Sequence, residues 1–409
     1  MMLTATSTTS INLKNFSGMN PFRTRRSLLN PLDASLRLLV LVALFLLPGC
    51  HTSSIPTLTS SKAFAPLEPE KGVYWGANLD WGNDSVSAFT GRLGLAPAVL
   101  VYFVNFPIPS NDQSGLDAYF QQVSQSGAIA LLTLEPFSGL QTVTADEANR
   151  LADYVAAKNK AGIRIMLRFA HEMNGSWYPW SQQPTACKVA FQRIADAVHA
   201  KTPDTAMIWA PNNGGGYPFT GGQYEAKTGT PDFKTLDTNG DGKLDQQDDP
   251  YAPYYPGDNY VDWVGMSLYH WGNAYPWGEN EVPESTSFID RLTGNYNGLN
   301  GDERAVPDFY NDYAVNHGKP LAITETSALY SPQAGGPGEL EIKRAWWNLI
   351  FSQDVFNRFP QLKMINWFEW RKYETEISDI VDWTISLNPE IRSAFVKDFP
   401  KNKFILGRG

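Results

Sequence analysis

The sequence predicts a barrel of eight parallel strands surrounded by helices, the TIM-barrel class of α/β fold, over residues 71–409. Short apolar runs follow one another along this stretch, and helix-compatible or loop segments separate them. Apolar runs without strict alternation are typical of strands buried on both faces, as in a parallel sheet covered by helices. The predicted strands are 72–79, 98–106, 128–136, 163–172, 205–212, 261–269, 320–327 and 363–370.

Helical patterns lie between several of these runs. In the segment 144–162, Thr144 can cap the amino end, Glu147 stands where a capping box places an acid, and Gly162 closes the helix. The segments 186–201 and 339–356 follow the same logic. An open doubly wound sheet is the rival fold, but it usually carries a glycine-rich phosphate loop after its first strand, and this sequence has none there.

Composition narrows the class of partner. The chain is 43% hydrophobic and 18% charged, an ordinary globular balance, yet 13% of its residues are aromatic, including 13 Trp and 18 Tyr. Its formal charge of -9 argues against binding to nucleic acid. Aromatic side chains suit flat, uncharged ligands such as sugar rings. We therefore expect a polysaccharide or oligosaccharide substrate, no nucleic acid, and a monomeric protein.

The amino terminus is predicted to be an export signal. Residues 21–50 run from a basic stretch into an apolar core that is short for a membrane span and end in "LLPGC". This ending is similar to a bacterial lipobox, so residues 1–49 are expected to be removed and Cys50 to be lipidated, with Pro48 as a departure from the usual small residue. The alternative is a plain signal peptide. Met19 is an alternative start codon to Met1.

Two further predictions follow from this reading of the amino terminus. Residues 50–70, rich in Ser, Thr and Pro, are expected to be a flexible tether between the membrane and the domain. Cys50 and Cys187 are the chain's two cysteines, so a lipidated Cys50 leaves Cys187 without a disulfide partner. The protein is therefore expected to be exported, either as a membrane-anchored lipoprotein or in secreted form.

Two glutamates stand where a barrel of this class carries its chemistry. Glu172 comes at the end of the fourth predicted strand and Glu325 at the end of the seventh, so both are expected at the mouth. Cleavage of a glycosidic bond with retention needs one carboxylic acid and one carboxylate about 5–5.5 Å apart. Two carboxyls at that distance share one proton most easily, so we assign Glu172 as acid/base and Glu325 as nucleophile.

The motifs around these acids resemble glycoside hydrolase family 26. "RFAHEMNGSWYPW" (168–180) is similar to that family's acid/base signature and "PLAITETS" (320–327) to its nucleophile strand. The stretches 255–272 and 366–383 resemble its sixth and eighth strand regions. The resemblance spans most of residues 72–385 and implies a retaining, endo-acting hydrolase on a TIM barrel, most often a β-mannanase, with some members acting on mixed-linkage β-glucan or β-1,3-xylan.

The same resemblance implies roles for individual residues beyond the two acids. It places the following side chains at the substrate: His171 before the acid, Trp177 beside the cleaved bond, Tyr269 near the nucleophile, and Trp367 as a floor for the sugar. Arg168 is expected to tether a catalytic carboxylate and is also predicted to be one of these substrate-site residues. The ending "SLYHWG" (267–272) and a long insertion at about 213–260 depart from the mannanase pattern, so the identity of the glycan stays open.

Structural roles compete with these assignments. Glu172 could be a salt-bridge partner of Arg168, and the rings of Trp177 and Trp180 could serve packing alone. Glu135, Glu369 and Asp382 also lie at or after strand ends. Each of these three acids could bind a sugar hydroxyl or anchor a loop.

The stretch "DTNGDGKLDQQD" (237–248) has the spacing of a calcium loop with Gly242 at the turn, although Asp replaces the usual Glu at its last position. A solvated turn without metal is the alternative. Catalysis itself is expected to need no cofactor. The predicted calcium ligands are Asp237, Asn239, Asp241, the Lys243 carbonyl, Asp245 and Asp248.

Three functions remain open at this point. The first is a retaining glycosidase cleaving a β-mannan-like or related β-linked polysaccharide through the two glutamates. The second is a non-catalytic glycan-binding lipoprotein, against which the intact pair of acids speaks. The third is a glycosidase with the same mechanism that processes the cell's own exopolysaccharide.

Overall fold

The computed structural model describes residues 64–273, 278–295, 297–298, 301–302 and 306–408. The predicted signal segment, Cys50 and most of the predicted tether lie outside these residues. Within them, no helix combines the length and the apolar character needed to cross a membrane.

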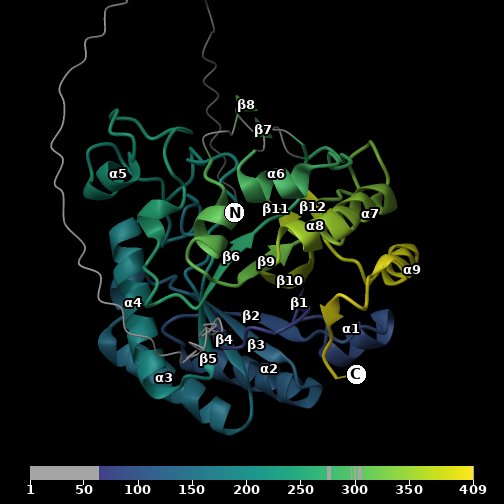
Figure 1. Ribbon diagram of the computed structural model, residues 1–409, viewed down its shortest axis with the longest axis horizontal. Coiled ribbons are helices and arrows are strands. Elements are labelled where there is room, and N and C mark those ends of the chain that lie inside the picture. Colours follow the sequence, from purple (N-terminus) through teal and green to yellow (C-terminus); the bar gives the residue numbers. More distant parts are fainter. Residues whose placement is uncertain (1–63, 274–277, 296, 299–300, 303–305, 409) are drawn as a thin grey trace, which may run out of the picture. The chain divides into compact units, whose positions relative to one another are not determined.

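Eight parallel strands close into a barrel, because the last of them, β10, pairs with the first, β1 (Figure 1). All eight were predicted, with ends that differ by at most three residues. A ninth short strand, β13 (Phe404–Ile405), adds to the outer edge of β1. The barrel strands are β1 (Val73–Leu79), β2 (Val99–Asn105), β3 (Ile129–Glu135), β4 (Ile165–Phe169), β5 (Thr205–Trp209), β6 (Trp263–Ser267), β9 (Leu321–Thr326) and β10 (Leu362–Glu369).

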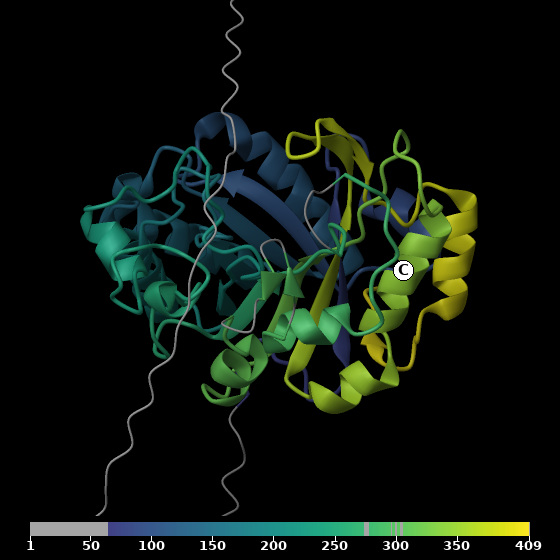
Figure 2. The same ribbon diagram turned by 90° about the horizontal axis from the view of Figure 1, so that it is seen from above.

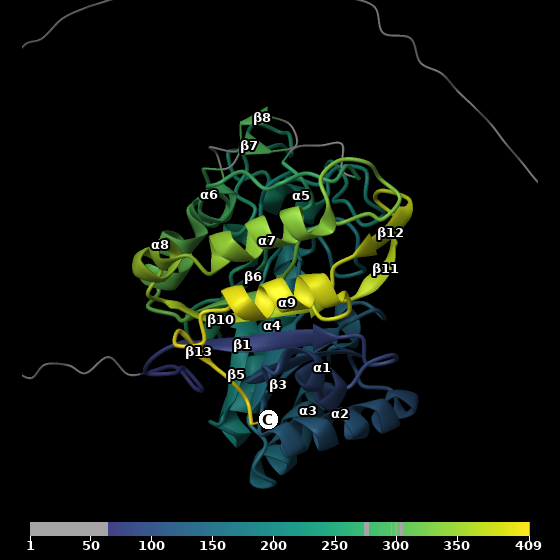
Figure 3. The ribbon, with the colours of Figure 1, turned by 90° about the vertical axis from the view of Figure 1, so that its right-hand side faces the viewer.

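Helices surround this barrel, so that the strands lie between helices on either side in Figure 2. Helices α3 and α4 pack against each other on one side, and α7 and α9 do so on another (Figure 3). The helices are α1 (Val86–Leu93), α2 (Gln113–Ser126), α3 (Ala145–Lys160), α4 (Pro184–Lys201), α5 (Pro231–Leu236), α6 (Ser287–Thr293), α7 (Glu339–Ile350), α8 (Gln353–Arg358) and α9 (Pro389–Asp398). The shorter elements are β7 (Asn297–Gly298), β8 (Gly301–Asp302), β11 (Arg371–Glu374), β12 (Asp379–Asp382), η1 (Ser110–Asp112), η2 (Leu140–Thr142), η3 (Ala252–Tyr254) and η4 (Tyr310–Val315).

The helix boundaries follow the capping chemistry of the sequence. Thr144 caps α3 as predicted, since its hydroxyl accepts the N–H of Glu147 at 3.2 Å. The prediction of one continuous helix over 339–356 is wrong. It divides into α7 and α8 because Ser352 caps a new helix by accepting the N–H of Val355.

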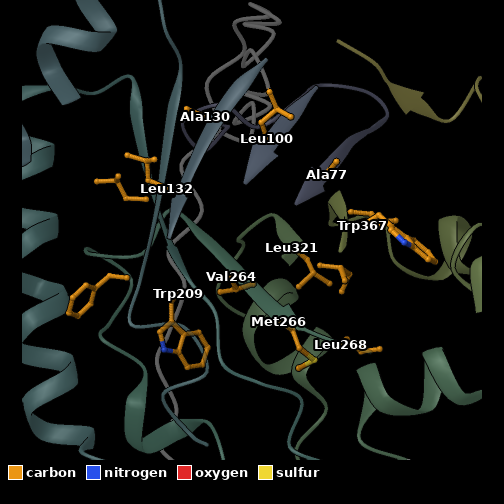
Figure 4. Close-up of a cluster of buried hydrophobic side chains, with 14 of the residues drawn as sticks. Ala77, Leu100, Ala130, Leu132, Trp209, Val264, Met266, Leu268, Leu321 and Trp367 are labelled. Atoms are coloured by element: carbon orange, nitrogen blue, oxygen red, sulfur yellow. The ribbon is translucent and has the colours of Figure 1, made fainter. Parts of the chain in front are cut away.

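Apolar side chains fill two separate layers. One lies between the barrel and the helices and includes residues from every barrel strand (Figure 4). The other, inside the barrel, is formed by strand residues such as Val101, Leu131 and Met166. Both faces of each strand are therefore buried, which explains the near-continuous apolar runs in the sequence.

The last part of the predicted tether belongs to the folded domain. Ala65 and Leu67 pack against the cluster inside the barrel, and the Trp263 indole donates to the Pro66 carbonyl at 2.8 Å. Trp263 begins β6, so this contact closes the amino-terminal end of the barrel. Residues 64–70, which were predicted as part of the tether, therefore belong to the folded domain.

The predicted insertion lies between β5 and β6 and carries α5 and η3. Its calcium-like loop is organised by its own side chains: the Asp241 N–H donates to Asp237 at 3.1 Å and to Asn239 at 2.9 Å. Asp248 is buried and accepts the N–H groups of Thr238 at 2.7 Å and Asp245 at 2.9 Å. In the residues that the structure describes, no three His, Cys, Asp or Glu side chains are arranged around a metal position, so calcium binding stays a prediction.

This hypothesis is tested by thermal unfolding with calcium and with excess EDTA. A bound ion would stabilise the folded state by mass action, so we expect EDTA to lower Tm by roughly 2–4 °C and calcium to restore it. The Asp241→Ala variant should show no response to EDTA. Equal melting temperatures of the unaltered protein in calcium and EDTA would rule the ion out.

A second prediction concerns a buried lysine. Lys343 on α7 is fully buried, and its ammonium contacts Glu339 at 2.6 Å, Asp382 at 3.1 Å and the Thr384 carbonyl at 2.6 Å. Lys343→Met would remove the cation from two partly buried carboxylates, so we expect a loss of about 3 kcal/mol in the free energy of unfolding.

Denaturant unfolding measures this loss. Lys158→Met is the matched control, because Lys158 also pairs with a carboxylate, Asp117 at 3.3 Å, but at an exposed site. We expect that substitution to cost less than about 1 kcal/mol. Similar losses for both variants would show that the buried cluster does not stabilise the fold as inferred.

Candidate active site

A cleft of about 620 Å³ opens at the carboxyl ends of the barrel strands. Residues from the ends of all eight barrel strands, or from the loops that follow them, form its walls. The lining residues are Trp81, Gly82, Tyr102, Phe103, Glu135, His171, Glu172, Trp177, Tyr178, Asn212, Gly215, Gly216, Phe219, Tyr269, Trp271, Glu325, Phe368, Trp370, Lys372, Glu374, Glu376 and Trp383.

Glu172 reaches the cleft through an unusual backbone path. After β4, Ala170 and Glu172 both take left-handed conformations, with φ of 48° and 55°. Such values are strained for residues other than glycine and occur often at functional sites. The Glu172 N–H is tied to the Ala210 carbonyl at 3.0 Å, which fixes the turn. The strained turn therefore holds Glu172 at a fixed position.

The surroundings of Glu172 favour its protonated form. Burial and the neighbouring charge of Glu325 raise its pKa to about 7, against the opposing effects of Ser267, Arg168 and Trp177. The Trp177 indole N–H donates to Glu172 Oε2 at 3.1 Å. Glu172 can therefore hold a proton near neutral pH and still has a donor that stabilises its ionised form.

Glu325 lies in the same cleft on β9. Strand β9 pairs with β6, and the register of this pairing shifts between Met266 and Ser267 of β6. After the shift, Ser267 lies opposite Glu325. A bulge of this kind re-aims side chains and is common beside active sites. The Glu325 carboxylate accepts two bonds: one from the Arg168 guanidinium and one from the Tyr269 hydroxyl at 2.7 Å. Both donors stabilise a negative charge on Glu325.

Arg168 acts beneath the cleft rather than in it. Its side chain is fully buried, its Nε donates to Thr133 Oγ1 at 3.1 Å, and it forms an ion pair with Glu325. The assignment of Arg168 as a substrate-binding residue is wrong, because a fully buried side chain that does not line the cleft cannot reach a ligand. The alternative pairing of Arg168 with Glu172 is also wrong. Arg168 instead tethers Glu325, which confirms the prediction that it holds a catalytic carboxylate.

His171 and Tyr269 both line the cleft, as does Trp177. The His171 ring packs against Phe103 and Tyr178 with centroids 5.4 Å and 4.9 Å away. Burial, together with the Arg168 charge, lowers the pKa of His171 well below its usual value. The imidazole is therefore neutral, and among the residues that the structure describes its Nδ1 has no hydrogen-bond partner.

Trp367 does not form a floor for the sugar, so that prediction is wrong. The side chain is fully buried in the layer between barrel and helices (Figure 4), 5.9 Å from the Phe395 ring of α9. Its indole N–H donates to the Trp383 carbonyl at 3.0 Å. Since successive side chains of a strand face opposite sides, the next residue, Phe368, lines the cleft instead.

The three rival acids separate into two groups. Glu135 lines the cleft, and burial raises its pKa to about 8 together with the charges of Glu325 and Glu172, against Arg168. Glu369 instead accepts the N–H groups of Ile385 and Ser386, both at 2.9 Å. Asp382 is bound to Lys343. These last two acids hold loops in place.

Several cleft residues were not predicted. Trp81, Trp271 and Trp370 stand one to four residues after the ends of β1, β6 and β10. Their positions after strand ends were a usable signal. Lys372 and Glu374 lie on β11, which pairs with β12 as a hairpin beyond β10, and nothing in their local sequence indicates that they face the cleft.

Comparison with known proteins relates this site to one family. The family model described as glycosyl hydrolase family 26 matches residues 138–226, which include β4 and Glu172. Endoglucanase H of Acetivibrio thermocellus is 26% identical over 323 residues, which are 76% of this chain and 28% of that protein. This chain thus corresponds to little more than a quarter of the relative's length.

Two solved structures are similar to this chain. GH26C from Muricauda sp. MAR_2010_75 has a TM-score of 0.50 and 14% identity, covering 82% of this chain and 87% of that one. The catalytic domain of the Bacillus sp. JAMB-750 GH26 endo-beta-1,4-mannanase has a TM-score of 0.49 and 16% identity, covering 82% and 88%. The sequence match, with the barrel on which it lies, confirms the predicted relationship: this chain is a relative of glycosyl hydrolase family 26 on a TIM-barrel fold.

Proposed function

We propose that this protein is a retaining glycoside hydrolase that cleaves a β-linked polysaccharide through a two-glutamate double displacement. The observation that carries the proposal is the pairing of two unlike carboxyls in one cleft. Glu325 receives bonds from a guanidinium and a phenol, whereas burial and the Glu325 charge keep Glu172 protonated near neutral pH. A nucleophile and a general acid need these two environments.

In the first step, a carboxylate oxygen of Glu325 attacks the anomeric carbon and the glycosidic C–O bond breaks. The proton of Glu172 passes to the leaving oxygen, and a glycosyl ester on Glu325 remains. The negative charge of Glu325 disappears in this step. Because that charge is one cause of the raised pKa of Glu172, the pKa falls when the ester forms.

In the second step, the ionised Glu172 takes a proton from water while the water oxygen attacks the anomeric carbon. The ester bond breaks, and the Glu325 carboxylate returns to its bonds with Arg168 and Tyr269. Two displacements restore the original configuration at the anomeric carbon. Glu172 thus acts as acid and base in turn.

The substrate class follows from the walls of the cleft. Rings of Trp, Tyr and Phe dominate the lining, which suits stacking against sugars. Among the lining residues that the structure describes, Lys372 supplies the ammonium, and this ammonium is paired with Glu374 at 3.1 Å. These lining side chains therefore offer an acidic glycan no unpaired cation, so we assign a neutral β-glycan. The relative's name, endoglucanase, agrees with this class.

The two acids are tested by substitution. We expect Glu172→Gln and Glu325→Gln each to lower turnover of a neutral polysaccharide at least 10²–10⁴-fold, because each removes a group that transfers protons or forms the covalent bond. Reducing ends released from a panel of mannans, β-glucans and xylans measure this. Azide should restore turnover to Glu325→Ala and give a glycosyl azide of inverted configuration.

Glu341 is an exposed acid on α7, so Glu341→Gln is the matched control and should leave turnover unchanged. Melting temperatures show whether each variant is folded. Full activity in a folded Glu172→Gln or Glu325→Gln variant would overturn the mechanism. If the unaltered protein cleaves no glycan but binds one, the non-catalytic glycan-binding function is the better description.

A pH prediction follows from the pKa of Glu172. Since the first step needs this acid protonated, kcat/KM should fall as the pH rises through about 7. The Trp177 indole N–H stabilises the ionised form, so Trp177→Phe raises the pKa of Glu172. We therefore expect the alkaline limb of the profile to move to higher pH in this variant.

Trp271→Phe provides the comparison, because Trp271 lines the same cleft but packs edge-on against Trp383, with centroids 5.0 Å apart. The alkaline limb of its kcat/KM profile should lie at the same pH as in the unaltered protein. An unchanged limb in Trp177→Phe, or the same displacement in both variants, would contradict the role assigned to the indole.

A further inference from the structure

Glu135 is an acid of the cleft that the proposed reaction does not use. It ends β3, and the alternation of that strand places its side chain on the inner face of the barrel, in line with Leu131 and Thr133. Leu131 packs in the layer inside the barrel, and Thr133 accepts the bond from Arg168. The Glu135 carboxyl therefore lies on the cleft side of Thr133, near the side chains that carry the reaction.

The carboxyl of Glu135 is bonded differently from the other acids of the cleft. Among the residues that the structure describes, neither a hydrogen bond nor an ion pair reaches its oxygens. Each of the other carboxyl groups in the lining has a protein donor within 3.3 Å. These donors are Trp177 for Glu172, Arg168 and Tyr269 for Glu325, Lys372 and Trp383 for Glu374, and Thr375 for Glu376. A partly buried polar group of this kind is available to a ligand.

The groups that face Glu135 favour its neutral form. Burial and the charges of Glu325 and Glu172 raise its pKa to about 8, and the charge of Arg168 offsets part of this rise. Two further titratable side chains of the loop after β4 line the same cleft and stay neutral, namely Tyr178 and His171. Glu135 therefore keeps its proton at neutral pH.

A neutral carboxyl binds a sugar differently from a carboxylate. Its O–H donates one hydrogen bond while its carbonyl oxygen accepts another, whereas a carboxylate only accepts. A sugar hydroxyl also donates and accepts, so the two groups are complementary. Because the charges of both catalytic acids act on Glu135, a hydroxyl bound there lies beside the cleaved bond.

We propose that Glu135 positions the substrate by binding a sugar hydroxyl beside the cleaved bond as a neutral carboxylic acid. Its O–H donates to the hydroxyl oxygen, and its carbonyl oxygen accepts from the same or a neighbouring hydroxyl. This inference rests on the proposed glycosidase function and adds to it a third acid that recognises the sugar.

The first test compares two substitutions at about pH 6, where Glu135 is protonated. Glu135→Gln keeps a donor and an acceptor in nearly the same shape, and Glu135→Ala removes both. For the polysaccharide cleaved best in the panel, we expect kcat/KM to stay within a few-fold in Glu135→Gln and to fall about 10- to 100-fold in Glu135→Ala. Equal losses in the two folded variants, or no loss in either, would overturn the proposal.

The second test measures binding without cleavage. Glu172→Gln lacks the catalytic proton, so calorimetry can follow its binding of a tetrasaccharide from that polysaccharide between about pH 6 and 9. Ionisation of Glu135 removes its donor, so the affinity should fall as the pH rises, by up to about tenfold per pH unit. The fall should begin at or below about pH 8, because the Glu172 charge that raises the pKa of Glu135 is absent from this variant.

The double variant Glu135→Gln/Glu172→Gln should bind with one affinity over this range, because an amide does not titrate. Glu341→Gln/Glu172→Gln, altered at the exposed acid on α7, is the matched control and should keep the fall. A fall that persists without Glu135, or an affinity that rises with pH, would show that Glu135 is not a neutral donor, and the glycosidase function would still stand.

Monodeoxy forms of the tetrasaccharide identify the hydroxyl. Loss of the hydroxyl that Glu135 binds should weaken binding to Glu172→Gln but not to Glu135→Ala/Glu172→Gln. If every form affects the two variants alike, Glu135 binds no hydroxyl. If the unaltered protein cleaves no glycan of the panel, the proposed function fails, and the same binding series with the panel's oligosaccharides decides the role of Glu135 separately. Should none of them bind, that role fails as well.

Discussion

The chemistry of the cleft depends on the electrostatic interactions of one buried guanidinium, that of Arg168, with three carboxyl groups. Arg168 pairs directly with Glu325, while Glu172 and Glu135 feel its charge without bonding to it. Away from water, the repulsion between neighbouring carboxylates is strong. Burial and the neighbouring carboxylates raise the pKa of Glu172 and of Glu135, and the charge of Arg168 offsets only part of this rise, whereas Glu325 alone of the three forms the direct ion pair.

Much of this arrangement could be predicted from the sequence, because it follows from strand ends. The apolar runs located all eight strands, and an acid at the end of a strand in a parallel barrel has to face the mouth. Glu172 and Glu325 were found in this way. The backbone details that aim them were not predictable: the left-handed turn at Glu172 and the register shift in β9 leave no mark in the residue types.

The wrong assignment of Trp367 has a different physical cause. In a strand with one wet face, alternation of polar and apolar residues reveals which side chains point inward. In β10 both faces are buried, so "NWFEW" carries no such signal, and Trp367 and Phe368 are equally plausible cleft residues by type. Sequence alone could place an aromatic residue near the site but could not decide between neighbours. The same ambiguity applies to every strand of a barrel covered by helices.

The two ends of the cleft are held by different kinds of interaction, and this has a consequence for how substrate range can change. Near β10, buried charges fix the wall: Lys343 binds Asp382, and Glu369 binds the N–H groups that follow Trp383. Replacing one partner there leaves a buried charge unpaired, which destabilises the fold. On the Phe219 side, neutral hydrogen bonds join the loop after β4 to the loop after β5 that carries Phe219. Such bonds contribute about 1 kcal/mol each, so that loop can vary at little cost to stability. The loop that carries Phe219 is therefore where selectivity can change while the barrel and both acids stay as they are.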